Sequence, residues 1–77
     1  MKILAMDEKE NELTITYETH DVALFELVVS RLNQEKGVEA TYIKEHPLVP
    51  KVVLTIRGKD PKKSLEKVIK KLEKEFK

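Results

Sequence analysis

The chain has 77 residues, of which 40% are hydrophobic and 38% are charged, with a formal net charge of +1 and no cysteine. This length suits a single domain, expected to span residues 1–77, and is too short for two hydrophobic cores. The lack of cysteine excludes disulfides, thiolate zinc sites and thiol catalysis. No apolar run approaches the about 20 residues of a membrane span, and no secretory signal is recognisable, so we expect a cytoplasmic protein without membrane contact.

The first part of the chain is predicted to form a β-hairpin. Residues 2–6 are rich in Ile, Leu and Met and indicate a strand, whereas the polar residues 7–11 indicate a turn. Apolar and polar side chains then alternate over residues 13–18, which is the pattern of a half-buried strand. The apolar members of that second strand are Leu13, Ile15 and Tyr17.

A helix is predicted for residues 21–36, with Asp21 as its N-cap and Gly37 as the left-handed residue that ends it. An apolar arc roughly 160° wide should cover the sheet. It consists of Val22, Leu24, Phe25, Val28, Val29 and Leu32. Ala23 and Leu27 fall outside this arc. Because one arc is enough to cover a sheet, the additional apolar surface predicts that a second protein covers part of this helix.

The second half of the chain repeats the pattern of two strands and a helix. Alternation over residues 38–44 predicts a third strand, which the two prolines of residues 46–50 should interrupt. Residues 52–57 alternate again and predict a fourth strand. A last helix should begin at Pro61, after the capping residue Asp60. Its single apolar stripe consists of Leu65, Val68, Ile69, Leu72 and Phe76.

The predicted element order is therefore β-β-α-β-β-α. The simplest packing is a two-layer α+β fold, in which a four-stranded sheet carries both helices on one face. The opposite face of the sheet should be exposed to water. Its polar side chains would be Thr14, Thr16, Glu18, Glu39, Thr41 and Thr55.

No catalytic or metal-binding arrangement is apparent in the sequence. His20 lies at the start of the first helix, where a capping or surface role is expected, and His46 has only Glu45 as a nearby metal ligand. The pterin dehydratases share the β-β-α-β-β-α order but act through a cluster of histidines, which this chain lacks. We therefore expect no cofactor and no metal, and place a small-molecule enzyme third among the functional classes.

Positive charge is concentrated at the end of the chain, where residues 57–77 hold nine basic and four acidic residues. Such a charge run is more often a solvated helix face, and the acids Glu66, Glu73 and Glu75 interleave with the lysines. The basic residues of the last helix remain candidate nucleic-acid contacts. They are Lys62, Lys63, Lys67, Lys70, Lys71 and Lys74.

The segment GVEATYIKEHPL, which ends in the triplet at residues 46–48, leads to a known family. The chain resembles subunit L of archaeal RNA polymerase, the counterpart of the eleventh subunit of eukaryotic polymerases, and more distantly the assembly domain of the bacterial alpha subunit. The resemblance covers nearly all 77 residues and includes ENELTITYE and DPKKSLEKVIKKLEKEF. At the start of the first helix, Asp21, Leu24 and Leu27 match the family pattern. Phe25 replaces a glycine of that pattern and Val22 replaces a histidine.

The resemblance implies a non-catalytic protein that pairs through its two helices with a larger polymerase subunit, called D in archaea. The pair would form the platform on which the catalytic subunits assemble, so the expected partners are this larger subunit and the rest of the polymerase core. Self-association is the alternative for the isolated chain, and DNA contact would be only indirect. The implied interface comprises Val22, Ala23, Phe25, Leu27, Val29, His46, Pro47, Leu48, Ile69 and Phe76.

The residues alone also support a second functional class. In this alternative, the chain is a stand-alone homodimer that binds nucleic acid through its basic last helix. The two functions are distinguished by the mass of the protein in solution, with and without the larger polymerase subunit.

Overall fold

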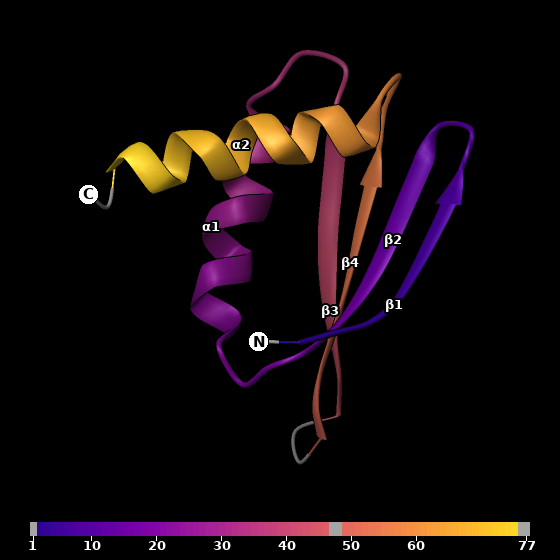
Figure 1. The fold of residues 1–77 in the computed structure, drawn as a ribbon, viewed down its shortest axis with the longest axis vertical. Coiled ribbons are helices and arrows are strands. Elements are labelled where there is room, and N and C mark those ends of the chain that lie inside the picture. The colour runs from indigo at the N-terminus through magenta and orange to yellow at the C-terminus, as the bar shows by residue number, and fades with distance from the viewer. Residues whose placement is uncertain (1, 47–48, 76–77) are drawn as a thin grey trace.

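The computed structural model describes residues 2–46 and 49–75, except for the side chains of residues 45, 46 and 49. The four strands form one antiparallel sheet in the order β1-β2-β4-β3, with two helices on one face, which confirms the predicted two-layer α+β fold. The elements in chain order (Figure 1) are β1 (Lys2–Lys9), β2 (Glu12–Glu18), α1 (Val22–Asn33), β3 (Glu39–His46), β4 (Val49–Arg57) and α2 (Pro61–Glu75).

The hydrophobic core lies on the helix-bearing face of the sheet. Strand pairing places Leu13 opposite Ile56 and Ile15 opposite Leu54, so that these side chains share one face. All four are at most 2% exposed. The other face has half-buried or exposed polar side chains, as predicted. They are Thr14, Thr16, Glu18, Glu39, Thr41 and Thr55.

The start of α1 confirms the predicted cap, but its end does not match the prediction. The Asp21 carboxylate accepts a hydrogen bond of 3.2 Å from the backbone amide of Leu24. The helix ends at Asn33 rather than at residue 36. The Asn33 side chain donates to the carbonyl of Ala40 at 3.0 Å and accepts from its amide at 2.8 Å. This pairing with β3 requires the chain to leave the helix and reverse direction, and Gly37 adopts a positive φ of 77° in that reversal.

The start of α2 also agrees with the sequence. The helix begins at Pro61, and the Asp60 carboxylate accepts a hydrogen bond of 3.3 Å from the amide of Lys63. Most of the described residues of the predicted apolar stripe are buried, namely Leu65, Val68 and Leu72. Ile69 is 40% exposed. The stripe is therefore only partly covered by this chain.

Both hairpins are longer than predicted. In the first, β1 continues to Lys9, which pairs with Glu12, so the expected turn over residues 7–11 shrinks to Glu10 and Asn11. In the second, β3 and β4 extend to His46 and Val49, which pair with each other beyond a register shift between Lys44 and His46.

The predicted proline interruption of the second hairpin is shorter than expected, because β4 already begins at Val49. Pro50 lies within β4, where its ring removes a donor but leaves its carbonyl free to accept from the Thr19 amide at 2.8 Å.

Candidate functional site

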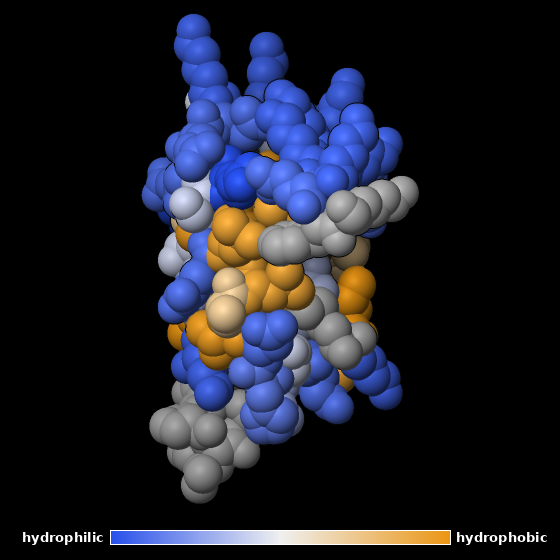
Figure 2. Space-filling view, turned by 90° about the vertical axis from the view of Figure 1, so that its left-hand side faces the viewer, coloured by the Kyte–Doolittle hydropathy of each residue, from blue (hydrophilic) through white to orange (hydrophobic). Residues whose placement is uncertain are grey.

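An apolar groove of about 330 Å³ lies between α1, α2 and the sheet. For scale, an engineered apolar cavity of about 150 Å³ is large enough to bind benzene. In Figure 2, apolar surface occupies the centre of one side of the molecule, with hydrophilic residues above and below it. The residues lining the groove are Tyr17, Leu24, Phe25, Val28, Leu54, Leu65, Ile69, Leu72 and Glu73.

Four elements build this groove. Leu24 and Val28 are one turn apart on α1 and form one wall, and the second wall is the apolar stripe of α2. Tyr17 and Leu54 contribute the floor from β2 and β4. Figure 1 shows α2 running across the C-terminal end of α1 rather than alongside it. The helices therefore diverge from their crossing, and the space between them stays open.

Aromatic rings pack against one another beneath the groove. The ring of Phe25 lies 5.0 Å from that of Tyr17 and 6.5 Å from that of Tyr42, measured between centroids. The Tyr42 hydroxyl donates a hydrogen bond of 3.1 Å to the Glu26 carboxylate. Burial raises the pKa of the Tyr17 phenol. Desolvation is also the larger cause of the raised pKa of Tyr42, and the neighbouring Glu26 carboxylate is the smaller cause. Both phenols are neutral at pH 7, so the groove-lining ring of Tyr17 adds no charge to the groove.

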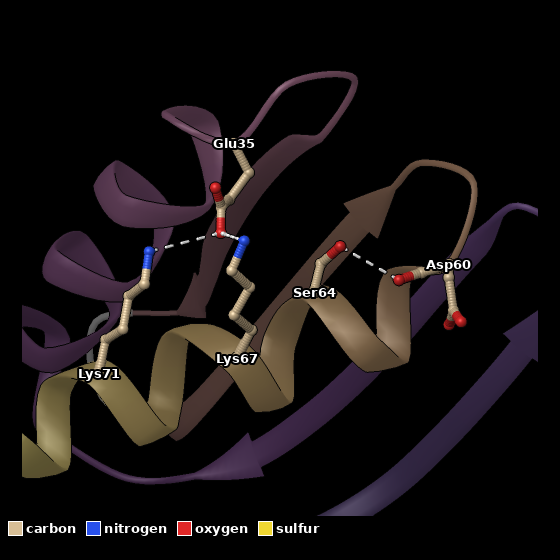
Figure 3. A network of polar contacts seen from close by, with 5 residues as sticks. All are labelled: Glu35, Asp60, Ser64, Lys67 and Lys71. Carbon is tan, nitrogen blue, oxygen red and sulfur yellow. Dashed lines mark hydrogen bonds and ion pairs between the residues drawn. The ribbon is translucent and has the colours of Figure 1, made fainter.

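Ion pairs connect the two helices where they cross. Figure 3 shows Glu35, just after α1, facing two lysines of α2: its Oε1 lies 3.1 Å from Lys67 Nζ and 3.9 Å from Lys71 Nζ. One turn further along α2, Glu75 pairs with Arg31 of α1 at 2.7 Å. Because these α2 residues recur every four positions, they share one helix face. The pairs link α2 to α1 at the crossing, and each of these partly exposed pairs contributes only modestly to stability.

The same lysines alter the acidity of Glu35. The hydrogen bond from Lys67 lowers the pKa of this carboxyl group, and the charges of Lys67 and Lys71 add to the effect against an opposing contribution from desolvation. Glu35 is therefore ionised at neutral pH, and its attraction to α2 is fully present there.

The residues of α1 predicted to contact a partner occupy different environments. Phe25 is only 3% exposed and belongs to the core, so it could be reached only through the groove. Leu27 was expected outside the sheet-covering arc, but it is half-buried and packs against the core. Val22 and Val29 are also half-buried, whereas Ala23 is exposed. These residues therefore differ in how much of each side chain a partner could reach.

The remaining predicted contacts come from α2 and from the second hairpin. Ile69 is exposed and lines the groove, so it is brought together with Phe25 as expected for one site. The side chain of His46 is not described, and Pro47, Leu48 and Phe76 lie outside the described residues. For all of these positions, contact with a partner stays a prediction.

Sequence reasoning placed several groove residues in the core and not at a site. Leu24, Leu65 and Leu72 were expected only to cover the sheet, yet they also form the walls of the groove. Their helical spacing shows which face they share, but only the angle between the helices shows that the face is partly open. The exposed side chains of β1 were missed as well, because a short apolar strand normally reads as core.

The basic residues of α2 divide into two sets. Lys67 and Lys71 pair with Glu35 near the end of α1, although both side chains stay more than half exposed. The other predicted contacts are exposed on α2, namely Lys62, Lys63, Lys70 and Lys74. Within the described residues, no group of three or more acidic, His or Cys side chains is placed to hold a metal ion. None of the described helices is long and apolar enough to cross a membrane.

The geometry is that of a two-layer domain with an apolar groove between its helices and its sheet. Residues 12–77 match the RNA polymerase Rpb3/Rpb11 dimerisation domain. The chain belongs to this family. The matched range contains both helices and every residue that lines the groove of this Rpb3/Rpb11-type domain. It excludes β1.

A solved structure shares the fold of this Rpb3/Rpb11-type domain. It is subunit L of the DNA-directed RNA polymerase of Thermoplasma acidophilum, with a TM-score of 0.76 and 22% sequence identity. The alignment covers 97% of the chain described here and 75% of the Thermoplasma chain. No curated protein matches the chain.

Proposed function

We propose that this chain is a non-catalytic assembly subunit of a cytoplasmic, DNA-dependent RNA polymerase, and that all 77 residues act as one dimerisation domain. It pairs through its helices with the larger polymerase subunit that archaea call D, and the pair forms the platform on which the catalytic subunits assemble. The observation that carries this proposal is the apolar groove between α1 and α2 in a member of a dimerisation family.

The physical argument rests on the surface that the groove leaves exposed. Its walls and floor are almost entirely apolar, and Ile69 at its rim is 40% exposed. Removing such surface from water contributes about 25 cal/mol per Å² of apolar area. A domain of this size has little stability to spare, so burial against a partner would also stabilise the fold.

The test is the molar mass in solution, measured by light scattering after size exclusion, with and without the larger polymerase subunit from the same organism. We expect a one-to-one complex at micromolar concentrations. Finding the two proteins as separate species at concentrations of tens of micromolar would overturn the proposal. The mass of the chain alone also shows whether the isolated protein self-associates.

The alternative of a homodimer that binds nucleic acid retains one supporting observation, the exposed lysines on α2. It is weakened by the ion pairs of Lys67 and Lys71 with Glu35, because phosphate binding at these lysines would compete with those pairs. A self-dimer with submicromolar affinity for a defined DNA sequence would favour this alternative over assembly.

A further inference from the structure

The edge strand β1 exposes large apolar side chains that the family match leaves without a role. Ile3, Leu4 and Met6 are 54%, 43% and 52% exposed, and the matched range begins only at residue 12. A contiguous exposed apolar patch is a feature of interaction sites.

Two of these side chains continue the floor of the groove. Ile3 lies opposite Tyr17 and Met6 lies opposite Ile15 in the antiparallel pair of β1 with β2. Side chains directly opposite each other point to the same face of a sheet, so Ile3 and Met6 lie on the helix-bearing face. Tyr17 lines the groove. The apolar surface therefore runs from the groove across β2 to the edge of the sheet.

We propose that the groove and β1 form one binding surface, and that its occupant is an amphipathic helix of the larger polymerase subunit. Ile3 and Met6 then act as the outer wall of the site. This inference rests on the proposed function, because it takes that subunit as the source of the helix.

The width of the surface fits a helix. Leu54, Tyr17 and Ile3 lie on three adjacent strands, β4, β2 and β1. Adjacent strands are about 4.8 Å apart, so this floor spans roughly 10 Å. A helix with its side chains has a diameter of about 10–12 Å. One helix lying on this floor would contact β1 on one side and the walls formed by α1 and α2 on the other.

The edge of β1 is poorly suited to the other common mode of binding, the addition of a strand. The register shifts between Ile3 and Ala5, which interrupts the regular ladder at Leu4. The second half of the strand is charged, with Asp7, Glu8 and Lys9 in succession. Bulges and edge charges are features that prevent strands from pairing edge to edge. The partner should therefore lie over the face of β1 and not along its edge.

Charge narrows the chemistry of this helix further. Glu73 is the charged residue among the described residues that line the groove, and Glu8 of β1, opposite Leu13, adds a carboxylate on the helix-bearing face beyond Met6. A partner helix with a lysine or arginine beside its apolar stripe would complement these carboxylates. The occupant is thus expected to be apolar on one face and basic along the margin of that face.

The experiment compares Ile3→Glu and Met6→Glu with Ile43→Glu in binding to the larger polymerase subunit from the same organism. Ile43 is a matched control, because it is 61% exposed and pairs with Val53 on the opposite face of the sheet. We expect each β1 variant to raise the dissociation constant about tenfold or more, and Ile43→Glu to leave it within about twofold. Circular dichroism monitors the fold of each variant. If Met6→Glu fails to fold, Met6→Gln provides the comparison without the charge.

Each outcome separates this inference from the proposed function. If the wild type binds the larger subunit and the β1 variants bind like Ile43→Glu, the inference is overturned while the proposed function stands. If the wild type does not bind at all, both are overturned. If the wild type instead forms a homodimer that the β1 variants dissociate, the occupant is a second copy and not the polymerase partner.

Hydrogen exchange distinguishes a helix from an added strand. If a helix lies over the face of β1, the backbone amides of β1 that do not pair with β2 should exchange in the complex about as fast as in the free chain. Strong protection of those amides on binding would mean that a strand has been added, and would overturn the proposed occupant.

Discussion

Phe25 contributes an aromatic ring to the lining of the groove. It occupies a position where the pattern of the polymerase family has glycine, and its ring fills the space between Tyr17 and Tyr42. Sequence patterning predicted an apolar residue facing the sheet here, and the 3% exposure of Phe25 agrees. The pattern could not predict the contact with two aromatic rings from two strands, because such a contact depends on how the helix lies on the sheet.

Replacing a core leucine with alanine should destabilise the fold more where the side chain is fully enclosed than where it lines the groove. Leu32 is fully enclosed, whereas Leu65 lines the groove, so a cavity left by Leu32→Ala cannot merge with existing space. We expect losses of unfolding free energy of about 3–5 kcal/mol for Leu32→Ala and about 2–3 kcal/mol for Leu65→Ala. Urea denaturation measures both. Ile43→Ala on the open face should cost below about 1 kcal/mol, and equal losses for all three variants would contradict the assigned core.

Glu35 makes stability depend on pH in a defined direction. Its pKa is lower in the folded state than the ordinary value of 4.5, so its ion pairs stabilise the fold fully above that pH and progressively less as the solution becomes more acidic. Glu35→Gln should therefore lower the melting temperature at pH 7, and the difference from wild type should shrink toward pH 3. The exposed Glu66→Gln serves as control. A constant difference across this range would show that the ion pairs do not act on stability.

At the scale of elements, all six segments and the start of both helices could be predicted, because caps and apolar periodicity are local signals. The end of α1 could not. It depends on the side chain of Asn33 forming a two-bond pair with Ala40, and nothing near Asn33 in the sequence reveals that partner. The extended β1 had a similar cause, since charged residues 7–9 form a strand only because β2 pairs with them.

The pair between Asn33 and Ala40 should be measurable as a property of the junction between α1 and β3. Asn33→Ala leaves the amide and carbonyl of Ala40 without these partners, so we expect a loss of about 1–3 kcal/mol in unfolding free energy. Gln34→Ala, at the neighbouring exposed position, should change stability by less than about 0.5 kcal/mol. Similar small effects for both variants in chemical denaturation would mean that the pair does not hold the junction.

The basic face of α2 should bind DNA only through unselective charge. With Lys67 and Lys71 engaged by Glu35, the isolated chain should bind duplex DNA no more tightly than about 10⁻⁴ to 10⁻⁶ M at physiological salt. Binding should weaken steeply with added salt and differ little between sequences. Fluorescence anisotropy with two unrelated duplexes at two salt concentrations measures both properties. Submicromolar, sequence-selective binding would instead support the nucleic-acid-binding alternative.

At the scale of the whole molecule, the sequence predicted the layers but not the opening between them. The excess of apolar residues on α1 correctly indicated more apolar surface than the sheet requires. It placed that surface on the outer side of α1, at Leu27, which is half-buried and packs against the core, and whose contact with a partner stays a prediction. Further open surface lies in the groove because α2 crosses α1 at an angle, and such an angle has no signature in a single helix pattern.

Ile69 is the position at which partner binding and folding should separate most cleanly. It lines the groove yet is 40% exposed, so Ile69→Glu should leave the isolated domain folded while placing a charge in a contact that excludes water. We expect association with the larger polymerase subunit to weaken by several kcal/mol. Leu27→Glu should weaken both association and the fold, and Val28→Glu should disrupt the fold itself, because Val28 is buried. A pull-down with the larger subunit, combined with circular dichroism of each isolated variant, tests this order. Retained binding by a folded Ile69→Glu variant would remove the groove as the partner site and leave the assembly role supported by family membership alone.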